Sequence, residues 1–171
     1  GRFSAGNNTI DSLKKLGYKV DTSVTPHVKW YDKTRPELID FSKAPEQPYF
    51  IKEGGILEKG FPGNVLEVPV SIVRSRGLLG LKPKWLRPHF SDLRGFKKIV
   101  NKLTEKYSES DHLVFNMMFH NVEVMPLLSP YTSSEKDCKE YLRSIEGFLS
   151  YCKDNKIEFI GLSDLYEIFS K

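Results

Sequence analysis

An apolar run over residues 113–119 constrains the fold of this chain more than any other stretch, because it offers no polar face to solvent. Asn116 is its only polar residue. A run this short, apolar and partly aromatic favours a strand that is covered on both sides, as in a parallel sheet. His120 follows at the carboxyl end of the predicted strand, where catalytic residues gather in parallel α/β folds. His120 is therefore a candidate catalytic residue. The alternative is a histidine that caps a core strand and binds nearby backbone.

Length and composition describe one ordinary globular domain. The chain has 171 residues, of which 39% are hydrophobic and 28% are charged, and this is enough apolar content to bury a core. Its 26 basic and 22 acidic residues are interspersed, and the longest basic clusters are pairs. Such pairs indicate solvated helix faces, so only the net charge of +4 favours a nucleic-acid partner. We expect a single domain over residues 1–171 that binds no nucleic acid.

The sequence also gives no sign of a membrane segment or a disulfide. No run approaches the about 18 consecutive apolar residues of a membrane span, and no signal peptide is present. Cys138 and Cys152 fall in one predicted helix, roughly 21 Å apart along its axis, which is too far for a disulfide. The compartment is left open between the cytoplasm and the cell envelope, and the oligomeric state is left open as well.

Helix and strand signals alternate along the chain. Capping residues and amphipathic spacing predict helices at 9–16, 91–107, 134–152 and from 163 onward, with Thr9, Ser91, Ser134 and Ser163 as caps. Alternating or apolar runs predict strands at 18–24, 65–73, 113–124 and 157–160. This order predicts an α/β fold with a mainly parallel sheet. Because four strands are too few for a closed barrel and residues 1–6 form a loop with no preceding strand, we expect N-terminal units to be missing.

Two stretches are predicted to be loops. Residues 31–62 contain several prolines and glycines, which indicates a loop-rich insertion with a short strand at 49–52. Such an insertion can border a site or be a surface elaboration. Residues 77–88 form the second predicted loop. Pro69 cannot donate to a β-ladder, so we expect an edge, a bulge or a break within the strand at 65–73.

No metal or nucleophile motif is complete in the chain. There is no His-x-x-x-His motif and no cysteine pair with ligand spacing. His112 and His120 would lie roughly 26 Å apart on one strand, and Glu123 would point to the opposite face from His120 if that strand continued. There is also no Gly-x-Ser-x-Gly elbow and no phosphate-binding glycine loop. We therefore predict that this chain alone holds no metal ion.

Two aromatic regions are candidates for sugar binding. Asp21 lies on the polar face near the end of a predicted strand, and Trp30 follows closely. A carboxylate beside exposed aromatic rings suits sugar recognition, because the rings pack against the apolar faces of sugars. The alternative is that Asp21 caps a turn and Trp30 fills the core. Trp85 and Arg87 form a similar pair, for which a structural role is the alternative because Pro83 and Pro88 fix the loop around them.

Several short motifs follow one another in a characteristic order. The strongest is Met117-Met118-Phe119-His120 with Glu123, followed by Ser129-Pro130-Tyr131. The others are Gly1-Arg2-Phe3-Ser4, Leu16-Gly17-Tyr18, the run from Val20 to Pro26, Glu67-Val68-Pro69, Trp85-Leu86-Arg87-Pro88 and Leu162-Ser163-Asp164-Leu165. In this order they resemble the C-terminal half of the polysaccharide deacetylase family, the metal-dependent carbohydrate esterases. The resemblance covers most of the chain outside residues 31–62, and it depends on the order because no single motif is highly specific.

The resemblance implies part of a distorted (β/α) barrel and a hydrolase that removes acetyl groups from an N-acetylated or O-acetylated glycan. In the family, a divalent metal, most often zinc, activates water, an Asp acts as base and a late histidine protonates the leaving group. His120 matches that histidine. Asp21 and Trp30 match the family's Asp-Trp motif loosely, because they are not adjacent here, and Arg2 is a possible match to its arginine motif.

The family's Asp-Asp strand and its His-x-x-x-His metal ligands have no counterpart in this chain. They would lie before Gly1, so we expect the chain alone to bind no metal and to be inactive. A poly- or oligosaccharide is the implied partner. The alternative is a carbohydrate-binding or structural remnant without chemistry.

Overall fold

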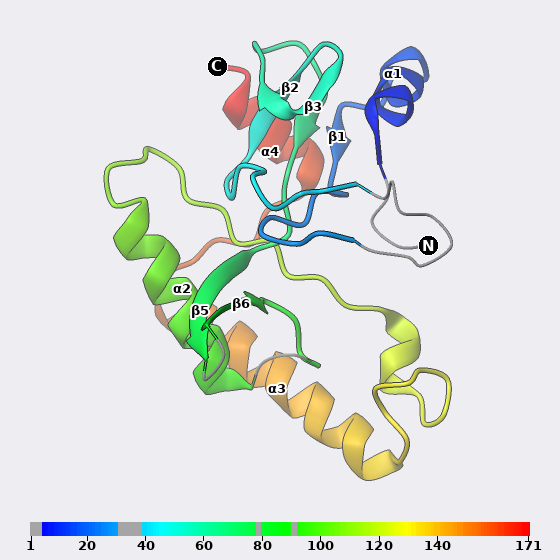
Figure 1. The fold of residues 1–171 in the computed structure, drawn as a ribbon. Helices are drawn as coiled ribbons and strands as arrows, with labels where there is room; N and C mark the ends of the chain where they lie inside the picture. Colours follow the sequence, from blue (N-terminus) through cyan, green and yellow to red (C-terminus); the bar gives the residue numbers. More distant parts are fainter. Residues whose placement is uncertain (1–4, 31–38, 78–79, 90–91) are drawn as a thin grey trace. The chain divides into compact units, whose positions relative to one another are not determined.

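The computed structural model describes residues 5–30, 39–77, 80–89 and 92–171, and these form two compact units. The first unit spans residues 1–83 and 160–171, and the second spans residues 84–159 (Figure 1). Within the described residues, no helix has the length and apolar character needed to cross a membrane.

The first unit is built on a four-stranded sheet in the order β1-β4-β2-β3. The strands are β1 (Val20–Asp21), β2 (Tyr49–Lys52), β3 (Gly55–Lys59) and β4 (Leu66–Glu67). Only β1 and β4 run parallel, with Asp21 opposite Glu67, whereas β2 is antiparallel to both β4 and β3. Helix α1 (Asn7–Lys15) contacts β3, and helix α4 (Leu162–Phe169) contacts β1 (Figure 1).

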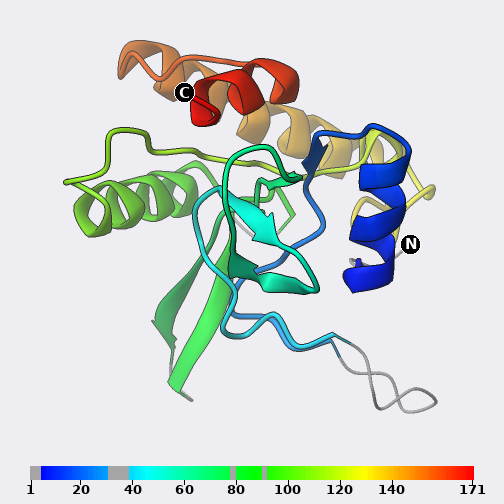
Figure 2. The ribbon, with the colours of Figure 1, turned by 90° about the horizontal axis from the view of Figure 1, so that it is seen from above.

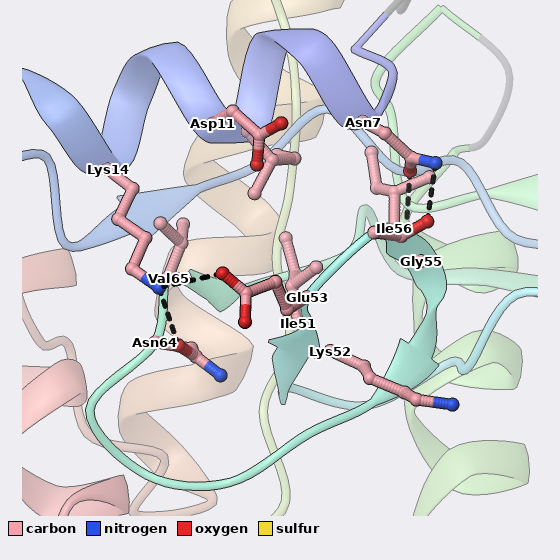
Figure 3. A pocket seen from close by; sticks show the side chains of 12 residues that line it. Asn7, Asp11, Lys14, Ile51, Lys52, Glu53, Gly55, Ile56, Asn64 and Val65 are labelled. Carbon is pink, nitrogen blue, oxygen red and sulfur yellow. Dashed lines mark hydrogen bonds and ion pairs between the residues drawn. The ribbon is translucent and has the colours of Figure 1, made fainter.

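The core of the first unit is formed by buried side chains of α1, β2 and β3 and of the segments that connect the helices and strands. Val24, Phe41 and Leu66 are fully buried there. The side chain of Asn7 ties α1 to the turn between β2 and β3, because its amide donates to the Gly54 carbonyl at 2.6 Å and accepts the Ile56 N–H at 3.0 Å (Figure 3). The hollow beside these bonds has a volume of about 20 Å³. It has room for about one water molecule, so we assign it no ligand.

A two-stranded antiparallel sheet follows, formed by β5 (Ile72–Gly77) and β6 (Gly80–Trp85). The second unit contains α2 (Leu93–Lys106) and α3 (Glu135–Asp154), which pack together (green and orange helices in Figure 2). The 3-10 turn η1 (Asn121–Val124) packs on α3. The rings of Phe96 and Phe148 lie 4.9 Å apart between the two helices. The Ser134 side chain accepts the Asp137 N–H and Asp137 binds back, a capping box that fixes where α3 begins.

The prediction of a mainly parallel sheet from part of a (β/α) barrel is wrong, because only one strand pair of the mixed sheet is parallel. Residues 112–120 and 157–160 form no strand. In the first of these segments, residues 113–118 are only half-buried, and Met118 donates to the Leu86 carbonyl at 3.4 Å. A strand needs a neighbour along its whole length, and an apolar run supplies burial energy but no partner.

The predicted helices are present, with small shifts at their ends. α1 begins two residues earlier than expected, and Thr9 accepts the Gly6 N–H at 3.3 Å instead of standing at the cap. Asp92 caps α2, Gly161 stands before α4, and Ser91 lies outside the described residues. The strand predicted at 65–73 breaks at Pro69 into β4 and β5. The loop predicted at 77–88 is wrong, since β6 occupies much of it.

Candidate functional site

A buried carboxylate in the second unit gathers three other polar side chains around it. The side chain of Glu123 is 1% exposed, and its hydrogen-bond partners are Arg87, His120 and Tyr141. We call these four residues the Glu123 network. Arg87 comes shortly after β6, His120 and Glu123 belong to η1 and its cap, and Tyr141 lies on α3. Three separate segments thus converge on one charge.

The 3-10 turn brings His120 and Glu123 to the same side of the backbone. His120 caps η1, and its carbonyl accepts the Glu123 N–H at 3.0 Å. Residues three apart eclipse each other in a 3-10 helix. As a result, Nδ1 of His120 lies 2.8 Å from Oε1 of Glu123. Glu123 would point to the opposite face from His120 only if a strand continued through it, and the 3-10 turn stands in place of that strand.

The contacts of His120 decide which ring nitrogen carries a proton. Nδ1 lies 2.8 Å from the carboxylate of Glu123 and 3.4 Å from a guanidinium nitrogen of Arg87. It cannot donate to the first and accept from the second at once. The carboxylate is closer and can only accept, so Nδ1 carries the proton. Nε2 has no hydrogen bond to the described residues, and the side chain is 55% exposed. The second nitrogen is therefore open to a ligand.

Arg87 is fixed from two directions. Its guanidinium donates to Oε1 of Glu123, and its side chain is only 6% exposed. The guanidinium carbon lies 4.8 Å from the ring centroid of Tyr131, a cation–π geometry. The ring of His89 lies 4.0 Å from that same Tyr131 ring. Tyr131, which lies between η1 and α3 in the sequence, thus helps to hold Arg87 beside Glu123.

The network keeps Glu123 negatively charged. Burial on its own would raise the pKa of Glu123, but the hydrogen bonds from Tyr141, His120 and Arg87 outweigh burial and lower it. Burial and the adjacent carboxylate raise the pKa of Tyr141, so its hydroxyl stays protonated and can donate. The ionised carboxylate can stabilise a positive charge on His120 whenever that ring takes up a second proton. The arrangement suits general acid–base chemistry.

An open cleft of about 560 Å³ lies beside the network and shares Tyr141 with it. The cleft is also lined by His89, Tyr131, Glu140 and Ser144. Its volume lies within the usual range for small-molecule sites, and its aromatic rings, carboxylates and hydroxyls form a mixture that suits a polar ligand.

The other predicted sugar-binding residues are placed as follows. Trp85 is buried at the end of β6, two residues before Arg87. Trp30 belongs to the first unit, where it packs against the core and its indole N–H donates to Thr25 Oγ1 at 2.9 Å. Asp21 also belongs to the first unit and accepts the Ser23 hydroxyl at 3.0 Å. These contacts of Trp30 and Asp21 are those of the structural alternatives, and sugar binding by either residue stays a prediction. Arg2 lies outside the described residues.

Asp21 has a second neighbour that the sequence did not indicate. Glu67 is fully buried opposite it on β4, and Oε1 of Glu67 accepts the Val24 N–H at 2.9 Å. Burial, and then the Asp21 carboxyl, raise the pKa of Glu67 well above its ordinary value. Glu67 therefore holds its proton to a higher pH than an ordinary glutamate, beside a second carboxyl group.

Of the predicted site residues, the network unites His120 with Arg87. Sequence reasoning missed Glu123 and Tyr141 as functional residues. The spacing of three between His120 and Glu123 was a usable signal, because Pro126 follows closely and shortens any strand there. Tyr141 carried no separate signal, because it also fits the apolar stripe of its helix.

The described residues offer no metal centre. They contain no group of three or more His, Cys, Asp or Glu side chains that could hold an ion. The donor set therefore does not fit the divalent metal that the resemblance to polysaccharide deacetylases implies. Comparison with the known protein families, with curated proteins and with solved structures finds no match to this chain.

Proposed function

We propose that this chain supplies the general acid of a polysaccharide deacetylase, an enzyme that hydrolyses acetyl groups from an N-acetylated or O-acetylated glycan. The observation that carries the proposal is the 2.8 Å contact between His120 Nδ1 and Glu123, combined with the 55% exposure of the His120 side chain. One ring nitrogen is held by a buried carboxylate and the other is open. The order of the motifs around His120 suggests the reaction, and the geometry supports the role of His120.

The role of His120 follows from the tautomer. When water adds to the acetyl carbonyl and the bond to the sugar nitrogen or oxygen breaks, the leaving atom needs a proton. A doubly protonated His120 can donate it from Nε2, and the ring then returns to the Nδ1–H tautomer that Glu123 holds. The carboxylate of Glu123 stabilises the imidazolium before the transfer. Arg87 and Tyr141 keep that carboxylate ionised and in place.

This chain is assigned the general acid, His120, and the residues that hold it in place. The other groups of the reaction are not assigned to it. The described residues do not fit a metal ion, so no step here depends on one. The base that takes a proton from water is also not among the Glu123 network. We therefore expect that the described residues by themselves release no acetate.

The test measures acetate release from N-acetylated chitin oligomers and from peptidoglycan by the native protein. His120→Ala should lower kcat by roughly 10²- to 10⁴-fold, the usual contribution of a general acid. His112→Ala, eight residues earlier on the same segment, is the matched control and should leave kcat unchanged. Acetate release that survives in His120→Ala would remove the proposed role. Glycan binding without acetate release in the native protein would favour the non-catalytic alternative.

A further inference from the structure

The two oxygens of Glu123 are divided unequally among its three partners. Oε1 faces both the Arg87 guanidinium and Nδ1 of His120, whereas Oε2 accepts a hydrogen bond from the Tyr141 hydroxyl. An arginine fork favours binding both oxygens of a carboxylate side by side. In that geometry the carboxylate would turn toward Arg87, and Oε1 would move away from His120. The unequal division therefore needs a cause.

We propose that Tyr141 is a positioning residue that prevents Arg87 from binding both oxygens of Glu123 and so keeps Oε1 directed at His120. The terminal torsion of a glutamate is broad, so packing alone fixes the carboxylate plane poorly. A hydroxyl that donates to Oε2 fixes it at the second oxygen. This inference concerns the acid of the proposed function and rests on that function only for its catalytic consequence.

Burial and helix packing hold the Tyr141 hydroxyl in position. The residue is 6% exposed on α3, and the capping box of Ser134 and Asp137 fixes the first turn of that helix. Helix α3 packs against α2 through Phe96 and Phe148. A hydroxyl held in this way cannot follow the carboxylate if it turns. The raised pKa of Tyr141 keeps the group a donor.

The consequence is the choice of tautomer at His120. While Oε1 faces Nδ1, the neutral ring carries its proton there and Nε2 is open. If the carboxylate turned toward Arg87, the preference for Nδ1–H would weaken and Nε2–H would gain population. After it has donated its proton, Nε2 must accept another one before the next turnover. In the Nε2–H form this nitrogen already carries a proton and cannot accept one, so the function of His120 as an acid would be impaired.

The experiment records the long-range ¹⁵N–¹H spectrum of the histidine rings of this chain at an alkaline pH where they are neutral. In Tyr141→Phe, the ratio of Nδ1–H to Nε2–H tautomers at His120 should fall about five-fold, the change that one net hydrogen bond produces. Tyr151→Phe is the matched control, because Tyr151 lies on the same helix and its hydroxyl donates to Asn101, at 3.4 Å, and not to Glu123. His27 is an internal reference, since Arg74 donates to its Nδ1 at 3.2 Å.

An unchanged ratio in a folded Tyr141→Phe chain would overturn the inference, as would an equal fall in Tyr151→Phe. The double variant Arg87→Lys/Tyr141→Phe should recover the Nδ1–H form, because lysine has no fork with which to hold both oxygens. If Tyr141→Phe fails to fold, 3-fluorotyrosine placed at position 141 keeps the shape and strengthens the donor. The ratio should then rise, and a constant ratio would count against the inference.

Measurements of acetate release by Tyr141→Phe and His120→Ala separate this inference from the proposed function. Tyr141→Phe should lower kcat for acetate release about ten-fold and change KM less, because the hydroxyl donates to Glu123 Oε2. Acetate release that survives in His120→Ala, together with a shifted tautomer ratio in Tyr141→Phe, would refute the function and keep the positioning role. A normal ratio in Tyr141→Phe, with activity lost in His120→Ala, would do the reverse.

Discussion

Oε1 of Glu123 lies 2.8 Å from Nδ1 of His120, and the same oxygen accepts from the guanidinium of Arg87. One buried oxygen thus faces both an arginine and a histidine. Burying a carboxylate is costly unless a positive charge and hydrogen bonds compensate it. The network supplies both, and its members should therefore depend strongly on one another for stability.

Removing the Glu123 carboxylate should destabilise the second unit. Glu123→Ala takes away the anion that faces the buried Arg87 guanidinium, and we expect a loss of about 3–5 kcal/mol in the free energy of unfolding. The double variant Glu123→Leu/Arg87→Met should recover most of that loss, because it removes both charges and refills the space. Urea unfolding followed by circular dichroism measures both variants.

Glu135→Ala is the control for this prediction. Its side chain is 84% exposed and pairs only weakly with Lys139, at 4.0 Å, so little change in stability is expected. A small loss in Glu123→Ala, comparable with that of the control, would mean that the buried pair contributes little to the fold.

Local patterns predicted the helices well because their causes are local. Ile99 and Leu103 fall on the buried stripe of α2, and Ser134 with Asp137 marks the start of α3. The strand at 113–124 was wrong because pairing depends on distant segments that no local pattern reveals. The bond between Met118 and the Leu86 carbonyl, at 3.4 Å, is a long-range contact of that kind.

The candidate site was only half predictable for the same reason. His120 and Arg87 stood out as polar residues within recognisable motifs. Glu123 was set aside because the argument from side-chain alternation assumed a strand, whereas a 3-10 turn follows a spacing of three. Tyr141 fits an apolar helix stripe by its ring, and only the fold shows where its hydroxyl goes.

The Asn7 side chain is exposed, but we expect it to stabilise the first unit. It bonds the Gly54 carbonyl and the Ile56 N–H, and so joins α1 to the turn between β2 and β3 (Figure 3). Asn7→Ala should lower the free energy of unfolding by about 1–2 kcal/mol. Asn8→Ala, one residue along the exposed side of the same helix, should change it little. Equal effects of the two substitutions on thermal unfolding would contradict this role.

Glu67 should make the first unit less stable as pH rises. Burial first, and then the Asp21 carboxyl, raise the pKa of Glu67 in the folded protein above the unfolded value. Between those two values the folded chain holds a proton that the unfolded chain has lost. The stabilisation is therefore complete below the unfolded pKa and declines as pH rises toward the folded one. Burial first, and then the carboxyl of Glu67, also raise the pKa of Tyr49 on β2.

Glu67→Gln tests this directly, because glutamine keeps the size of the side chain and the acceptor for the Val24 N–H at 2.9 Å. The free energy of unfolding of the unmodified chain should fall as pH rises above about 4.3, where an ordinary glutamate loses its proton. The decline should be much flatter in Glu67→Gln. Glu53→Gln, whose side chain is 85% exposed, should reproduce the slope of the unmodified chain. If Glu67→Gln kept that slope too, the carboxyl of Glu67 would titrate normally in the folded protein. Burial beside Asp21 would then not raise its pKa.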